Sequence, residues 1–196
     1  ARKDITAKYQ KKLDSKKWNR EWSPVYSAMI DAVDISVGRV TATLKKHGLE
    51  KNTLVIFTSD NGGHSITSNK PLKGQKGAFY EGGVRVPFFV RWDGVLAPER
   101  DVDRVAAHID LFPTLADVAG VDKLPDGQVE GRSLVPLLKK PKAKWKDRHF
   151  FTQKARWRTG SEPNDNQWKG FAVRNQRYRL VDKNLYDMAK DPNQTT

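Results

Sequence analysis

The strongest constraint on the fold is an apolar run that stops abruptly in a polar, glycine-rich segment. Residues 54–57 read Leu-Val-Ile-Phe without interruption, and Ser59, Asp60, Asn61 and two glycines follow directly after Thr58. An unalternating apolar run of this length is typical of a strand covered on both faces. The sequence therefore predicts a buried strand over residues 54–58 that delivers polar side chains to the edge of a sheet.

A helix is predicted immediately before this strand. Ser23 is placed to cap it, Pro24 suits its first position, and Gly48 suits its end. Five apolar residues recur at helical spacing and predict one buried face: Met29, Val33, Val37, Val40 and Leu44. A helix that runs into a buried strand indicates one α/β unit of a mostly parallel sheet. The lysine-rich residues 1–22 predict a surface loop or a short helix.

Further elements follow the buried strand. Residues 84–90 predict a second strand, which Pro87 places near a sheet edge or bulge. Residues 110–118 predict a short helix that ends at Gly120, and the proline- and glycine-rich residues 124–141 predict a loop on the surface.

The last fifty residues change character. Residues 150–153, 171–174 and 178–181 read as short strands, with a tight turn at Asn175 and Gln176. We therefore expect an α/β fold, in which part of a mostly parallel sheet flanked by helices precedes a small C-terminal antiparallel sheet. The predicted division gives an α/β core over residues 1–145 and a subdomain over residues 146–196.

Composition limits the partners. The formal net charge of +13 predicts an anionic partner, such as nucleic acid, acidic lipid, or a sulfated or phosphorylated polymer. No nucleic-acid motif accompanies the basic residues, so we expect no specific nucleic-acid partner. No run approaches the roughly 20 apolar residues of a membrane span. The absence of cysteine excludes disulfides, thiolate zinc sites and a cysteine nucleophile within this sequence.

The polar segment after the first strand contains candidate metal ligands. Asp60 and Asn61 offer a carboxylate and an amide oxygen side by side, which are ligands that hard cations such as Ca²⁺ take. The alternative is an Asx turn that closes the strand. His64 follows closely and could donate a proton or contact a substrate, or it could be a surface-loop histidine. His108 lies in an apolar setting and is interpreted as a packing histidine.

A glycine-flanked lysine follows this segment. Lys76 lies between Gly74 and Gly77, where the missing side chains allow an anion to approach the ammonium closely. The alternative is an exposed loop lysine, and Lys73 is a second candidate for the same anion-binding role. Residues 81–85, with Glu81 and Arg85, predict a structural turn with an internal ion pair.

The order and spacing of these segments resemble the sulfatases of the alkaline phosphatase superfamily. The resemblance extends from about residue 23 to residue 196. It rests on MIDAVDISVGRV at residues 29–40, TSDNGG at 58–63, the lysine loop at 71–87, IDLFPTLADVAG at 109–120, and the AVR, YRL and LYD segments at 172–174, 178–180 and 185–187.

The resemblance implies a sulfuric ester hydrolase acting on a sulfated carbohydrate or an aryl sulfate. Asp60 and Asn61 then correspond to two calcium ligands, and Lys76 to the lysine that binds the sulfate group. The family nucleophile is a formylglycine made from cysteine or serine, in an N-terminal part that this sequence does not contain. We therefore expect a C-terminal portion that is inactive alone and has the missing N-terminal half as a possible partner. The family resemblance suggests a periplasmic or secreted protein.

Two alternatives to a sulfatase remain at the level of sequence. A phosphodiester or phosphonate monoester hydrolase of the same superfamily would differ in its missing nucleophile. A non-catalytic basic module would bind polyanions through its lysine clusters, with an affinity that falls steeply with salt and depends on neither calcium nor Lys76. That module leaves the ordered match over residues 58–87 unexplained.

Overall fold

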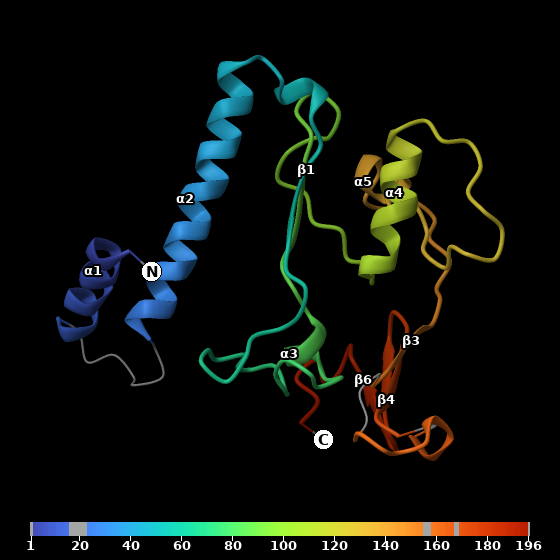
Figure 1. Cartoon of the computed structure of the whole chain (residues 1–196). Coiled ribbons are helices and arrows are strands. Elements are labelled where there is room, and N and C mark those ends of the chain that lie inside the picture. Colours follow the sequence, from blue (N-terminus) through green and yellow to red (C-terminus); the bar gives the residue numbers. More distant parts are fainter. Residues whose placement is uncertain (1, 16–22, 155–157, 167–168, 196) are drawn as a thin grey trace.

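A computed structural model describes residues 2–15, 23–154, 158–166 and 169–195 of the chain. The molecule is elongated (Figure 1). A helical arm of α1 and α2 lies on one side, a pair of strands lies in the middle, and α4, α5 and a C-terminal sheet lie on the other side. None of the described helices combines the length and the apolar character that a membrane span requires.

The helical arm begins with α1 (Lys3–Asp14), which packs against α2 (Pro24–Lys46). The predicted N-cap of α2 is confirmed, because the Ser23 side chain accepts a hydrogen bond from the Tyr26 amide at 3.3 Å. Gly48 has a φ of +66° just beyond the helix, which explains why glycine occupies this position. The short-helix alternative for residues 1–22 is correct as far as residue 15, and residues 16–22 lie outside the described part.

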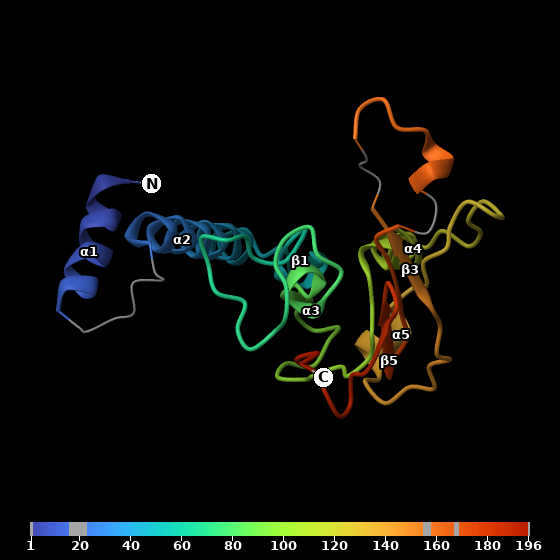
Figure 2. The ribbon, with the colours of Figure 1, turned by 90° about the horizontal axis from the view of Figure 1, so that it is seen from below.

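The predicted burial of the apolar face of α2 is wrong for this chain. Met29, Val33 and Val40 are 51%, 45% and 55% exposed, and Ala28 is the buried residue among the described positions of the helix. Within the described residues α2 contacts α1 and the 3₁₀ turn η1 (Glu50–Asn52). Figure 2 shows the arm standing apart from the C-terminal elements. The helix forms as its pattern predicts, but the described elements leave Met29, Val33 and Val40 exposed, while Val37 and Leu44 are half-buried.

The central strands form an antiparallel pair. Strand β1 (Val55–Thr58) pairs with β2 (Phe88–Arg91), so that Val55 lies opposite Arg91. The described residues contain no parallel pair, so the predicted mostly parallel sheet is not confirmed. Burial of β1 on both faces is also wrong here, since Phe57 is exposed and its ring lies 6.3 Å from that of the exposed Phe89.

The second predicted strand begins later than expected. Residues Glu81–Val84 form a helical turn, α3, and β2 starts only at Phe88, after Pro87. The predicted ion pair within this turn is confirmed, with Arg85 Nη1 4.0 Å from Glu81 Oε2. The reason for the turn is close packing, because the two glycines of α3 lie against neighbouring backbone that a side chain would overlap.

Two helices precede the C-terminal sheet. The predicted helix is confirmed as the 3₁₀ turn η2 (His108–Asp110) followed by α4 (Leu111–Val118), and Gly120 has a φ of +75° at its end. The surface loop expected over residues 124–141 is corrected, because α5 (Val135–Lys139) forms there and packs on α4. Leu137 is almost fully buried at this contact, and its burial stabilises a helix that the sequence pattern is too short to indicate.

The C-terminal sheet is an antiparallel meander of four strands, in the order β3-β4-β5-β6. The predicted strands β3 (Phe150–Gln153), β4 (Phe171–Arg174) and β5 (Tyr178–Val181) are confirmed, and β6 (Asn184–Asp187) is an addition. The buried core of this sheet comprises Ala172, Val181, Tyr186 and Met188, with Phe79 and Tyr80 packed against it. The loop before α3 therefore shares a core with the C-terminal sheet.

A buried ion cluster strengthens this contact. Glu81 accepts a hydrogen bond from Arg179 Nη2 at 2.6 Å and lies 3.7 Å from Arg174 Nε, and both arginines come from the C-terminal sheet. The Glu81 amide donates to Oε1 of the fully buried Gln194 at 2.8 Å. Burial lowers the pKa of Arg179 and of Arg174, and the charge of Glu81 opposes both shifts. One carboxylate thus compensates two largely buried guanidinium groups.

Removal of this carboxylate is expected to destabilise the fold. We predict that Glu81→Ala lowers the free energy of unfolding by about 3–5 kcal/mol, because it leaves a buried arginine charge uncompensated. Urea unfolding followed by circular dichroism measures the change. Asp126→Ala is the control, since it removes an exposed ion pair with Lys123 and should leave the midpoint unchanged. Equal midpoints for the two variants would contradict a stabilising role for Glu81.

Candidate functional site

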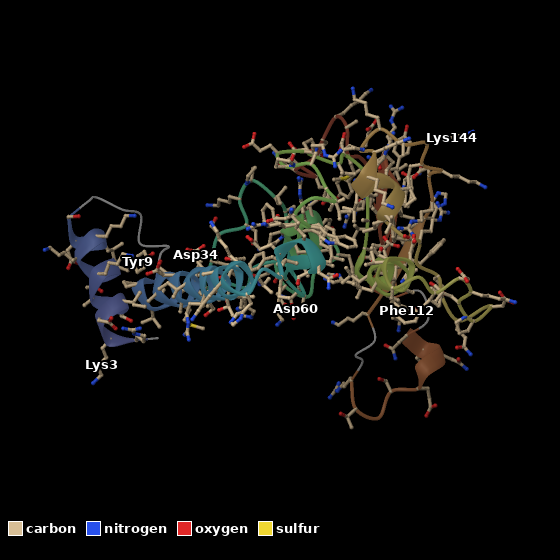
Figure 3. All side chains as sticks on the ribbon, turned by 90° about the horizontal axis from the view of Figure 1, so that it is seen from above. Lys3, Tyr9, Asp34, Asp60, Phe112 and Lys144 are labelled. Carbon is tan, nitrogen blue, oxygen red and sulfur yellow. The ribbon has the colours of Figure 1, made fainter. Side chains whose placement is uncertain are left out.

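The turn after β1 is held by backbone contacts with α3. The Gly62 amide donates to the Gly83 carbonyl at 2.9 Å. A Cβ atom on Gly62 would overlap the carbonyl oxygen of Gly82, so only glycine permits this approach. The adjacent Asp60 is exposed, and Figure 3 labels it between the helical arm and the elements that carry Phe112. The fold thus presents Asp60 on a turn that is itself rigidly packed.

The side chains of Asp60 and Asn61 have free oxygen atoms. The Asp60 carboxylate makes no hydrogen bond or ion pair with the described residues. Asn61 donates through Nδ2 to the Gly62 carbonyl at 3.1 Å, which leaves its Oδ1 without a donor in the described part of the chain. These two oxygens have the chemistry of calcium ligands.

Two oxygen ligands are too few to hold calcium by themselves. Calcium takes six to eight oxygen ligands. The residues in the described ranges contain no group of three or more His, Cys, Asp or Glu side chains that could hold a metal. Asp60 and Asn61 therefore fit calcium in donor type but need further ligands, and their metal-binding role stays a prediction.

The lysine loop lies directly against this turn. The Lys76 amide donates to the Gly63 carbonyl at 2.9 Å. Asn69 reinforces the contact, because its Nδ2 donates to the carbonyls of Gly63 at 2.9 Å and Gly74 at 3.2 Å. The side chain of Lys76 is exposed, and its ammonium has no partner among the residues that the structure describes. The two segments that the sequence singled out are therefore neighbours, and a cation is available beside the Asp60 turn.

Lys73 has a different environment from Lys76. Its Nζ lies 4.6 Å from the centroid of the Tyr80 ring and 5.3 Å from that of Tyr186, and it donates to the Tyr186 hydroxyl at 3.3 Å. Burial raises the pKa of Tyr80, with a further contribution from its hydrogen bond to Tyr186. The ammonium of Lys73 is thus engaged by protein groups, whereas that of Lys76 contacts none within the described ranges.

Two of the four histidines, His64 and His108, lie near the turn after β1. His64 is exposed, and its Nδ1 lies 2.8 Å from the Ser65 hydroxyl. Its role as a proton donor stays a prediction. His108 differs from the predicted packing histidine, because it is exposed and its Nε2 lies 2.9 Å from the Ser59 carbonyl. A carbonyl only accepts, so Nε2 carries the proton. No local sequence signal links His108 to a residue 49 positions away.

Comparison with known proteins identifies the family. The sulfatase family model matches residues 2–121. The model for the C-terminal part of N-sulphoglucosamine sulphohydrolase matches residues 75–196. The chain belongs to the sulfatase family.

Individual relatives extend this result. Steryl-sulfatase of Rattus norvegicus is 42% identical over 123 residues, which cover 58% of the chain and 21% of that relative. The crystal structure of Ps i-CgsB in complex with k-i-k-neocarrahexaose has a TM-score of 0.81 and 28% identity over 100% of the chain and 42% of that protein. The phosphonate monoester hydrolase of Agrobacterium radiobacter has a TM-score of 0.64 and 29% identity, over 88% of the chain and 36% of that protein.

The sulfatase chain is short relative to these proteins. It spans only 21% and 27% of the lengths of two curated sulfatase relatives. Large parts of those proteins thus have no counterpart in this sequence.

The glycine contact at the turn provides a direct test. We predict that Gly62→Ala lowers the melting temperature by several degrees and displaces residues 60–63, because its Cβ would overlap the backbone of α3. Thermal unfolding and amide chemical shifts measure the two effects. Gly38→Ala is the matched control, since Gly38 has open space in α2 and alanine should stabilise the helix by up to about 1 kcal/mol. If Gly62→Ala keeps the melting temperature and chemical shifts as Gly38→Ala does, the contact between Gly62 and α3 does not exclude a side chain.

Proposed function

We propose that this chain is the part of a sulfatase that supplies calcium ligands and a sulfate-binding lysine for the hydrolysis of sulfuric esters. Asp60 and Asn61 are the proposed ligands, and Lys76 is the proposed sulfate-binding residue. The main support for the proposal is the hydrogen bond from the Lys76 amide to the Gly63 carbonyl. This bond joins the segment of Lys76 to the turn that presents the side-chain oxygens of Asp60 and Asn61. Membership of the sulfatase family supports the same assignment.

The residues of the chain have distinct chemical roles in this proposal. The Lys76 ammonium binds sulfate oxygens as a point charge and stabilises the negative charge that grows on them during hydrolysis. When calcium is bound, it supplies Lewis-acid stabilisation of the same oxygens. His64 lies on the adjoining loop, and we propose that its imidazole protonates the leaving alcohol oxygen.

The remaining groups are proposed to come from polypeptide outside this sequence. The sequence contains no cysteine, so a formylglycine made from cysteine must be carried elsewhere, together with the other calcium ligands. We propose that this polypeptide covers the exposed apolar side chains of the arm and the central strands, which include Met29, Val33, Val40, Phe57 and Phe89. Exposed apolar surface of this extent is typical of an interface rather than of a free surface. The chain alone is then inactive.

The proposed substrate is a sulfated carbohydrate or an aryl sulfate. The net charge of +13 suits a sulfated polysaccharide, because it attracts polyanions, but it does not distinguish such a substrate from an aryl sulfate. The relative Ps i-CgsB was crystallised with a neocarrahexaose, whereas another relative is a steryl-sulfatase. A panel of sulfated oligosaccharides and aryl sulfates separates these two classes.

Lys76 gives the decisive test of the function. In the complete enzyme we expect Lys76→Met to lower kcat/KM for sulfate release by about 100-fold or more, as does the loss of one charge-stabilising group in other enzymes. Removal of calcium by a chelator should abolish activity. Lys142→Met is the control, because Lys142 is an exposed lysine on a segment remote in sequence from the turn.

Two results would contradict the proposal. Sulfate release by the isolated 196-residue chain would show that no further polypeptide is needed. Binding of a sulfated polymer that depends on salt but on neither calcium nor Lys76, without hydrolysis by the complete protein, would indicate a polyanion-binding module.

A second hydrolase activity has support from one neighbour. The similarity to the phosphonate monoester hydrolase makes phosphonate monoesters or phosphodiesters alternative substrates of the same site. Lys76 would then bind phosphoryl oxygens, since a point charge does not distinguish the two anions. The ratio of kcat/KM for matched sulfate and phosphonate esters decides between the two activities.

A further inference from the structure

We propose that Lys73 is a positioning residue, which fastens the lysine loop to the C-terminal sheet through Tyr80 and Tyr186 and so fixes the position of Lys76. This inference rests on the proposed function, because it assigns Lys76 the contact with sulfate. It gives Lys73 a role distinct from substrate binding.

The side chain of Lys73 bridges two segments that are far apart in the sequence. Its ammonium lies within cation–π distance of Tyr80, from the lysine loop, and of Tyr186, from β6. The two rings pack edge to face, with their centroids 6.0 Å apart, and Tyr186 is buried in the core of the C-terminal sheet. The hydrogen bond to the Tyr186 hydroxyl spans 113 positions, so the contact joins the loop to a rigid strand.

The backbone of the same residue is fixed as well. The Lys73 carbonyl accepts a hydrogen bond from the Gly82 amide of α3 at 2.8 Å. A Cβ atom on Gly82 would overlap the carbonyl oxygen of Gly74, so the backbone of residues 73–74 is in direct contact with α3. Residue 73 is therefore held on one side by its side chain and on the other by its main chain.

The contact is close enough to Lys76 to determine its position. Only Gly74 and Gln75 separate Lys73 from Lys76, whose amide is bound to Gly63. This short segment is thus attached at one end to the C-terminal sheet and at the other end to the turn that carries Asp60. Gly74 has a φ of +86° and would allow many conformations if the Lys73 attachment were lost.

A double-mutant cycle in the complete enzyme tests the role of Lys73. Lys73→Met is expected to lower kcat/KM for a sulfate ester by about tenfold, and Lys73→Arg, which keeps a cation over the rings, by less than about threefold. Tyr186→Phe should lower kcat/KM in the parent but have no further effect in the Lys73→Met background. Multiplicative effects of the two substitutions would show that Lys73 acts independently of Tyr186, which overturns the proposal.

Amide hydrogen exchange in the 196-residue chain gives a readout that does not depend on activity. Lys73→Met should accelerate exchange at Lys76 and Gly82, whose amides hold the loop, whereas Lys76→Met should not. Unchanged exchange in Lys73→Met overturns the positioning role. Failure of the complete enzyme to hydrolyse sulfate esters would instead overturn the proposed function and leave the exchange result in place.

Discussion

The buried carboxylate of Glu81 holds together the two regions on which the candidate site depends. It sits at the start of α3 and compensates the charges of two arginines from the C-terminal sheet. Because this fixes α3, the glycines of α3 can form a surface against which the turn after β1 packs. The positions of Asp60, Asn61 and the lysine loop follow from that surface. An ion cluster of one carboxylate and two guanidinium groups thus supports the surface on which the turn with Asp60 and Asn61 packs.

Local signals in the sequence predicted the elements that are fixed by local chemistry. Ser23 marks the start of α2 and Gly48 its end, because a cap and a positive φ depend on one or two residues. Strands β3 to β5 also follow from their own patterns. The turn at residues 81–85 is also predicted, but its helical form and the late start of β2 at Phe88 are not, since they depend on backbone contacts with Gly62 and Lys73 that no local pattern encodes.

Burial and side-chain partners could not be predicted in the same way. The pattern of α2 indicates an apolar face, but the burial of that face depends on what packs against it. The described residues leave Met29, Val33 and Val40 exposed. The sequence singled out Asp60, Asn61 and Lys76 through motif order, whereas the hydrogen bond between Lys76 and Gly63 required the fold. His108 was placed in a core because its neighbours in sequence are apolar, and its contact with Ser59 is long-range.

The packing of Gly62 on α3 has a consequence for how such a site can change over time. Where two peptide backbones touch without side chains between them, the contact itself does not depend on the identity of exposed side chains nearby. Substitution at an exposed position such as His64 therefore leaves this backbone contact in place. A Cβ atom on Gly62, Gly82 or Gly83 would overlap neighbouring backbone, so we expect sequence variation at the exposed side chains of the turn rather than at these glycines.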